Sequence, residues 1–122
     1  MIHLSHREFV KLVRQAYRQL PAHIQLALKN VDVSVAEWPG TEELELLEEG
    51  HTLFGLYIGV PLTEREGPGP VLPDRIVVYR QPIMQSCSTN EEVVEQVRIT
   101  LWHEVGHYLG ISEEDLHRLG YG

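Results

Sequence analysis

Lysine is scarce in this sequence, and the scarcity limits the kinds of partner that we expect. Lys11 and Lys29 are the only lysines, and ten basic residues stand against 18 acidic ones, so the formal net charge is -8 over 122 residues. Nucleic-acid binding depends on clustered Lys and Arg side chains that neutralise phosphates. The arginines are scattered along the sequence, and we therefore expect no nucleic-acid partner.

Cysteine and long apolar runs are also nearly absent. Cys87 is the one cysteine. This excludes an intrachain disulfide and a zinc site made of four thiolates, and we interpret Cys87 as a small buried thiol. No window approaches 18 consecutive apolar residues, and residues 1–9 are too polar for a signal core, so we expect a cytoplasmic protein without a membrane partner. With 43% hydrophobic residues, residues 1–122 are predicted to form a single domain.

The apolar pattern predicts a chain that mixes helices and strands. Apolar spacing, capping residues and glycines predict helices over residues 5–20, 21–28, 89–110 and 112–120. Alternation and β-branched residues predict strands over residues 31–36, 52–60 and 75–80, with Gly55 and Gly59 as points of bulge or close approach. The acidic residues 41–50 are interpreted as a short helix or ordered loop, and residues 61–73 as a surface loop.

The last long predicted helix carries a candidate metal site at His103-Glu104-Val105-Gly106-His107. Two histidines four residues apart lie on one helical face, so both imidazoles can bind a single ion. Glu104 can then stand beside a water molecule that the ion activates and act as general base. In the alternative interpretation, both histidines are hydrogen-bonded structural groups.

Besides this motif, three other stretches carry a resemblance to a known family. They are residues 56–65 (Leu-Tyr-Ile-Gly-Val-Pro-Leu-Thr-Glu-Arg), residues 76–80 (Ile-Val-Val-Tyr-Arg) and residues 110–116 (Gly-Ile-Ser-Glu-Glu-Asp-Leu). Together with the histidine motif and Gly110, they extend the likeness over nearly the whole chain. The sequence resembles the small bacterial zincin-like metallopeptidase family, described as predicted zinc-dependent proteases with a minimal matrix-metalloprotease-like domain.

The resemblance implies an α/β fold of the α+β kind. In this zincin-like arrangement, a small mixed sheet packs on an active-site helix that carries the His-Glu-x-x-His motif. The resemblance also implies a zinc-dependent peptidase whose substrate is a peptide or a protein. Residues 75–81 would lie near the cleft as an edge strand, and a peptide could pair with that edge. Val78→Pro would then impair peptide binding more than folding.

The third zinc ligand is the point at which this sequence departs from the larger zincins. Their extended pattern places a His or Asp ten positions after the first histidine, and here that position is Glu113. A carboxylate is an acceptable zinc ligand, and Gly110 permits the turn that brings residue 113 back toward the ion. Glu113 is the favoured third ligand, and the alternatives are His117, Asp115, an upstream group or water.

Two functions are consistent with these residues. The first is a peptide hydrolase with metal ligands His103, His107 and Glu113 and with Glu104 as the catalytic base. The second is a non-catalytic, metal-stabilised module that binds a peptide or protein on a zincin scaffold. Glu104 favours the enzyme, because a purely structural site needs no base. The shortness of residues 111–122 favours the module, because we expect no room there for the Met-turn of metzincins or the distant glutamate of gluzincins. The enzyme also needs an oxyanion donor, for which the nearby candidates are Tyr108, His117 and Tyr121.

Overall fold

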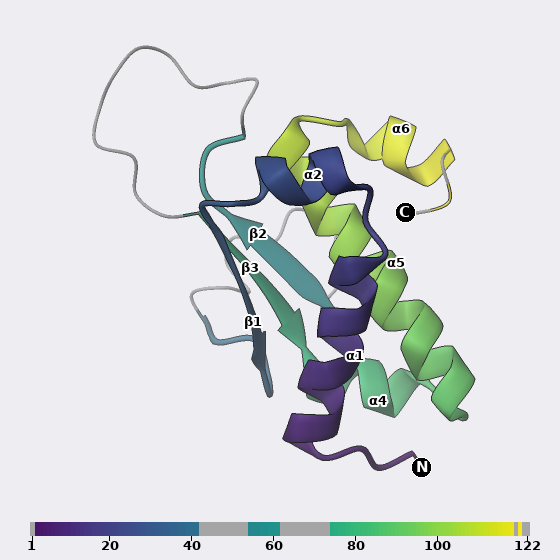
Figure 1. The fold of residues 1–122 in the computed structure, drawn as a ribbon. Coiled ribbons are helices and arrows are strands. Elements are labelled where there is room, and N and C mark those ends of the chain that lie inside the picture. Colours follow the sequence, from purple (N-terminus) through teal and green to yellow (C-terminus); the bar gives the residue numbers. More distant parts are fainter. Residues whose placement is uncertain (1, 42–53, 62–73, 119, 121–122) are drawn as a thin grey trace.

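The computed structural model describes residues 2–41, 54–61, 74–118 and 120. In chain order its elements are α1 (His6–Arg18), α2 (Ala22–Ala27), β1 (Val31–Ala36), β2 (Gly55–Ile58), β3 (Asp74–Tyr79), α4 (Arg80–Ser86), α5 (Asn90–Leu109) and α6 (Glu113–Arg118). Figure 1 shows the strands as one layer, with α1 and α5 lying along the same side of it. The α+β class is therefore confirmed: a small mixed sheet packs on the helix that carries the histidine motif.

β3 is the central strand of the sheet, and this corrects one prediction. The strand order is β1-β3-β2, with β1 parallel and β2 antiparallel to β3. The expectation that residues 75–81 form an edge strand is wrong, because β3 is paired along both edges. The physical reason is visible in residues 76–79, which are all buried. Such a continuous apolar run is typical of a strand that is covered on both faces.

The chain turns directly from β3 into α4, a helix that the sequence pattern did not predict. Pro82 lies in the first turn of α4, where a residue without an N–H group costs no helical hydrogen bond. Arg80 is 5% exposed and anchors this junction. Its Nε and Nη2 donate to the carbonyl oxygen of Leu4 at 2.9 and 2.6 Å, and its Nη1 pairs with Glu37. The buried guanidinium thus joins three separate segments.

Both long helices begin at the predicted capping residues. Ser5 Oγ accepts from the N–H of Glu8 at 3.1 Å, and the Glu8 carboxylate accepts from the N–H of Ser5 at 3.3 Å. Thr89 Oγ1 likewise accepts from the N–H of Glu92 at 3.1 Å. Such caps satisfy N–H groups that have no partner within the helix, and each contributes about 1 kcal/mol. Gly110, with φ of 83°, is the left-handed C-cap of α5 that the sequence predicted.

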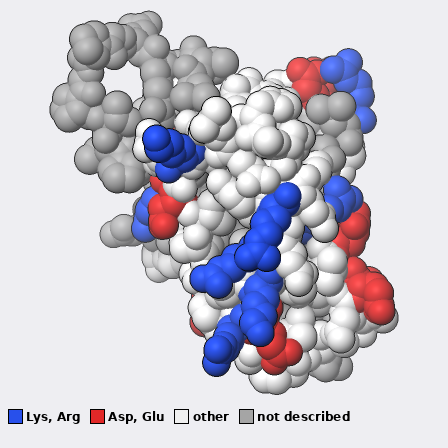
Figure 2. Space-filling view, in the orientation of Figure 1, with Lys and Arg blue, Asp and Glu red and all other residues white. Residues whose placement is uncertain are grey.

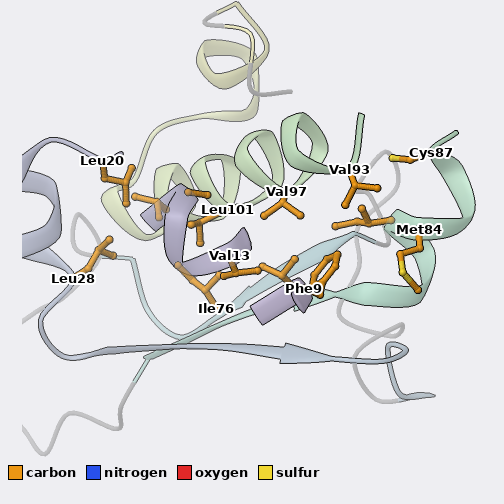
Figure 3. Close-up of a cluster of buried hydrophobic side chains, with 14 of the residues drawn as sticks. Phe9, Val13, Leu20, Leu28, Ile76, Met84, Cys87, Val93, Val97 and Leu101 are labelled. Atoms are coloured by element: carbon orange, nitrogen blue, oxygen red, sulfur yellow. The ribbon is translucent and has the colours of Figure 1, made fainter. Parts of the chain in front are cut away.

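The hydrophobic core lies between α1, α5 and one face of the sheet, as Figure 3 shows. The predicted apolar stripe of α5 is confirmed, since its members are at most 5% exposed: Val93, Val97, Leu101, Val105 and Tyr108. Cys87 borders this core and is 8% exposed, which confirms the buried thiol. Burial raises the pKa of that thiol and so disfavours the reactive thiolate. A smaller cluster on the other face of the sheet consists of Leu56, Val77 and Tyr79.

Several predictions fall outside the described residues. Those for most of residues 41–50 and of residues 61–73 cannot be compared with the structure, and neither can the first part of the strand predicted over 52–60, which is observed as Gly55–Ile58. In the described part of the chain, no helix is both long enough and apolar enough to cross a membrane. A cytoplasmic location and a single domain over residues 1–122 stay predictions.

Candidate metal centre

The last turns of α5 bring two imidazole rings together. His103 and His107 are one helical turn apart and therefore project from one face of the helix. Their ring centroids are 4.6 Å apart, with an angle of 62° between the ring planes. His103 is 7% exposed and His107 is half-buried. Both rings contact carboxylates and so take part in polar interactions.

The turn after α5 carries α6 back toward these histidines. Gly110 is left-handed, and the N–H of Ile111 donates to the carbonyl of Gly106 at 2.9 Å, which reverses the chain. Leu116, which is 1% exposed, packs directly on Gly106, and a Cβ atom at residue 106 would collide with Leu116 Cδ2. The glycine inside the motif therefore lets α6 approach α5 closely. This approach brings Glu113, the first residue of α6, to the histidines.

Glu113 meets both imidazoles through one carboxylate oxygen. Its Oε1 lies 3.3 Å from Nε2 of His103 and makes a closer contact with Nε2 of His107. Three donor atoms, two imidazole nitrogens and one carboxylate oxygen, thus converge. Glu113, the favoured third ligand of the sequence prediction, therefore lies in contact with both histidines, and its role as a ligand stays a prediction.

The chemistry of these donors, and the spacing of one pair of them, fit a zinc ion. Zinc binds imidazole nitrogen and carboxylate oxygen at about 2.0–2.2 Å, and a tetrahedral arrangement then separates two ligand atoms by about 3.3–3.5 Å. The 3.3 Å between His103 Nε2 and Glu113 Oε1 falls at this value. The contact between Glu113 Oε1 and His107 Nε2 is shorter than this value, so these two groups would have to move apart to admit an ion. Two histidines with one carboxylate are also a ligand set of catalytic zinc, which keeps a fourth position open. The donor set supports a metal site with an accessible coordination position.

Glu104 lies beside this donor set and is held from two sides. It is 3% exposed. The backbone N–H of Tyr57 in β2 donates to Glu104 Oε1 at 2.9 Å, and Nδ1 of His107 lies 3.3 Å from the same oxygen. The other oxygen, Oε2, faces Nε2 of His103 at 4.0 Å. One carboxylate oxygen is thus held by the protein, while the other faces Nε2 of His103.

The same contacts set the electrostatics of His107. Burial lowers the pKa of its imidazole, but hydrogen bonding and charge from Glu104, and then from Glu113, outweigh burial and raise the pKa above the ordinary value. Nδ1 faces Glu104 and Nε2 faces Glu113, so each ring nitrogen of His107 contacts a carboxylate. The two carboxylates that attract a proton here would also attract a metal cation.

Close packing between β2 and α5 makes the Tyr57–Glu104 hydrogen bond possible. A Cβ atom at Gly55 would collide with Thr100 Cγ2 and would lie 3.1 Å from the carbonyl oxygen of Val77. The close approach predicted at Gly55 is therefore confirmed. The part played by Tyr57 was missed, because a backbone N–H leaves no mark in the amino-acid sequence. Its neighbour Gly55 was the only signal that could have pointed to it.

The structure separates the remaining candidates from this centre. Asp115, a rival third ligand, pairs with Arg118 at 2.7 Å. His117 is exposed on α6, and no described contact joins it to the two histidines. The hydroxyl of Tyr108 donates to the carbonyl of Ala27 at 3.0 Å, which directs it toward α2 instead of an oxyanion. Tyr121, the remaining oxyanion candidate, lies outside the described residues.

Within the described residues, one group of histidine, cysteine and acidic side chains has donor atoms close enough together for a metal ion. It consists of His103, Glu104 and His107, whose donor atoms lie within 4.8 Å of one another. This group contains Glu104 in place of Glu113, although Glu113 Oε1 lies closer than Glu104 to Nε2 of His103. The family model described as zincin-like metallopeptidase matches residues 28–122, which include this group. The chain belongs to the zincin-like metallopeptidase family. The resemblance that the sequence motifs carried is thereby confirmed, and a metal-binding site is typical of this family.

A solved structure supports the fold of this chain but gives no information about its activity. A conserved hypothetical protein from T. thermophilus is similar to the chain with a TM-score of 0.56 and 20% sequence identity. The match covers 94% of this zincin-like chain and 99% of the other. At this identity the likeness concerns the fold alone. No curated protein sequence matches the chain significantly.

Proposed function

We propose that this zincin-like protein is a zinc-dependent metallopeptidase in which His103, His107 and Glu113 hold the ion and Glu104 is the general base. One observation carries the proposal. Glu113 Oε1 contacts Nε2 of both histidines, while Oε2 of the buried Glu104 lies 4.0 Å from Nε2 of His103. The substrate class is a peptide bond in a peptide or protein.

The residues of this centre divide the chemistry among them. A zinc ion, when bound, lowers the pKa of a water molecule toward neutrality and polarises a peptide carbonyl. Glu104 accepts the proton of the attacking water and delivers it to the nitrogen of the departing amine. The Tyr57 N–H engages Oε1 of Glu104, which leaves Oε2 for this proton. His107 is oriented by its Nδ1 contact with the same carboxylate.

The burial of Glu104 favours the enzyme over the non-catalytic module. Removing a carboxylate from water is costly unless the group is paired or hydrogen-bonded. A module that used the ion only to fix α6 would need His103, His107 and Glu113, and it could use Glu104 Oε1 to join β2 to α5, but it would have no use for Oε2 beside His103. The two functions therefore differ in the role of this one residue.

Glu104→Gln tests the proposal. The substitution preserves the size of the side chain and an acceptor for the Tyr57 N–H, and it removes the base. We expect unchanged zinc content, nearly unchanged thermal stability, and a loss of about two to four orders of magnitude in peptide hydrolysis. The assay offers a broad peptide library to zinc-loaded protein at neutral pH.

The control variants are His103→Ala and His107→Ala, which should lose stoichiometric zinc. Hydrolysis that survives Glu104→Gln would exclude Glu104 as the base. If the zinc-loaded wild-type protein cleaves no member of the library, the peptidase proposal is wrong and the binding module takes its place.

A further inference from the structure

A groove lies at the edge of the sheet that is opposite to the edge formed by β2. The strand order β1-β3-β2 places β1 at that opposite edge, and α1 contacts β1. The groove between α1 and β1 has a volume of about 510 Å³. Its apolar lining includes half-buried side chains from both elements: Val10, Tyr17, Val31, Val33 and Val35. Apolar surface is thus exposed along a strand edge that is remote from the metal centre.

Basic side chains border this groove. Helical spacing gathers four exposed cations on α1, although they look scattered in the sequence: Arg7, Lys11, Arg14 and Arg18. Figure 2 shows Lys and Arg side chains concentrated over α1. Arg14 and Arg18 line the groove itself. In a chain of net charge -8, this positive surface is an exception.

The cations of α1 differ in their pairing from three of the other arginines, although not from Arg75, for which no ion pair is described either. Arg80, Arg98 and Arg118 each form an ion pair with a carboxylate of the chain. No such pair involves the α1 cations within the part of the chain that the structure describes. Unpaired cations beside an apolar groove favour a ligand that combines carboxylates with apolar groups.

The backbone of β1 defines the shape of that ligand. Of the strands that the structure describes, only β3 pairs with β1, so the outer edge of β1 has no partner strand among them. An edge strand can accept an extended peptide as an added strand, with main-chain hydrogen bonds for affinity and alternate side chains for specificity. The residues along the edge, Val31 to Ala36, can pair with a segment of similar length.

The two ends of the groove differ in charge. His6, at the start of α1, pairs with Glu37 at 3.0 Å, just after the end of β1. A carboxylate is therefore already present at that end, and it would repel an acidic ligand. Arg14 and Arg18 lie near the other end of α1. The acidic residues of a ligand are expected there, beside the start of β1.

We propose that the α1–β1 groove binds an extended acidic segment of a partner protein, which adds to β1 as a further strand. Such a segment uses the strand edge, the apolar lining and the cations together. A nucleic acid would use the cations alone, and the net charge of -8 opposes it. Because β1 and β2 lie at opposite edges of the sheet, this groove docks a partner and does not present it for cleavage. The proposal is independent of zinc chemistry.

The first test uses a defined probe. A fluorescein-labelled nine-residue peptide that alternates valine and glutamate is titrated into the full chain, and binding is followed by anisotropy and by ¹H–¹⁵N NMR. We expect backbone resonances of residues 31–36 and of α1 to shift. The double variant Arg14→Glu/Arg18→Glu should weaken binding by about tenfold or more. The matched control, Arg7→Glu/Lys11→Glu, makes the same change of charge on the same helix outside the groove and should weaken binding much less.

A second peptide tests the strand pairing. N-methylation of alternate residues removes main-chain donors without changing the side chains, and it should abolish binding. The variant His103→Ala/His107→Ala should bind the unmodified peptide as the wild type does.

Equal losses in the two charge-reversed variants would overturn the proposal, because they would show nonspecific attraction. Full affinity of the N-methylated peptide, or absence of the NMR shifts at millimolar peptide, would also overturn it. So would tighter binding to a DNA duplex or to phosphatidylglycerol vesicles, or sedimentation data that show a second copy of the chain on β1.

Discussion

Glu104 and Glu113 both lie beside the same two imidazoles, and burial gives the two carboxylates different chemistry. The side chain of Glu104 is 4% exposed and that of Glu113 is 52% exposed. A buried carboxylate held by a backbone N–H keeps a fixed orientation, as a general base requires. An exposed carboxylate at the start of a short helix can be drawn to an ion at little cost in desolvation. The sequence contains both carboxylates, and their difference in burial favours Glu113 as the metal ligand and Glu104 as the base.

Substitution of the two rival ligands separates their roles. Glu113→Ala should weaken zinc affinity by at least about tenfold, because it removes a charged ligand that touches both imidazoles. His117→Ala should change the affinity little, since residue 117 is exposed on α6. Competition with a chelator of known zinc affinity measures both values. The reverse ordering would assign the third ligand to His117.

At the scale of the element, the metal centre depends on how closely α6 packs on α5. Leu116 covers Gly106, and this contact fixes the distance between the two helices. β2 approaches α5 in a similar way, because Gly55 packs against Thr100. Because Gly106 and Gly55 have no side chain, α6 and β2 can approach α5 closely. These approaches position Glu113, the proposed third ligand, and Tyr57, whose N–H contacts the proposed base Glu104.

Gly106→Ala tests this dependence. Alanine is the better helix former by about 1 kcal/mol, so an open site would become more stable. Here the added methyl group collides with Leu116, and we expect displacement of α6, no gain in thermal stability, and weaker zinc binding. The double variant Gly106→Ala/Leu116→Ala restores the space and should recover part of the zinc affinity. Wild-type affinity in the single variant would show that α6 does not position Glu113.

The central position of β3 in the sheet is also a property of a single element, and a substitution can test it. A central strand donates backbone hydrogen bonds to neighbours on both sides, and proline removes one donor and adds a clash. Because Val78 pairs with both Val35 and Gly55, Val78→Pro should abolish cooperative folding, as judged by circular dichroism and thermal melting. Val78→Ala retains the N–H and should fold with reduced stability. A folded Val78→Pro protein would contradict the strand order.

At the scale of the whole molecule, long-range contacts decide what the sequence could and could not predict. The caps at Ser5 and Thr89, the stripe of α5 and the histidine motif involve residues a few positions apart, and all were predictable. The contact between Tyr57 and Glu104 joins residues 47 positions apart. Strand order likewise depends on which segments meet in space, and a run of apolar residues does not specify its neighbours. A family resemblance supplied the fold but misplaced the edge strand.

The contacts of Arg80 and Glu37 join distant segments and should make stability depend on pH. The His6 hydrogen bond, followed by Gln81 and the charge of Arg80, lowers the pKa of Glu37 below its ordinary value of 4.5, against a smaller effect of burial. A carboxyl group with a lowered pKa in the folded state stabilises the protein above the unfolded value, and this contribution is lost as the pH falls through the folded value.

Glu37→Gln should therefore lower the free energy of unfolding near pH 6, and the difference from wild type should shrink as the pH falls below about 4.5. Urea unfolding at a series of pH values measures this difference. His6→Ala in the Glu37→Gln background should add less than it does in the wild type, because the two side chains are partners. A difference that grows toward acid would mean that the Glu37 contacts do not stabilise the fold.

The most direct measurement is a crystal structure of the zinc-loaded protein with anomalous diffraction data collected at the zinc edge. We expect one strong anomalous peak within about 2.0–2.2 Å of His103 Nε2, His107 Nε2 and a carboxylate oxygen of Glu113. Glu104 should lie outside the bonding distance, with an oxygen facing the remaining coordination position. A peak bound to Glu104 or His117 in place of Glu113, or no peak between the two histidines, would contradict the proposed zinc centre.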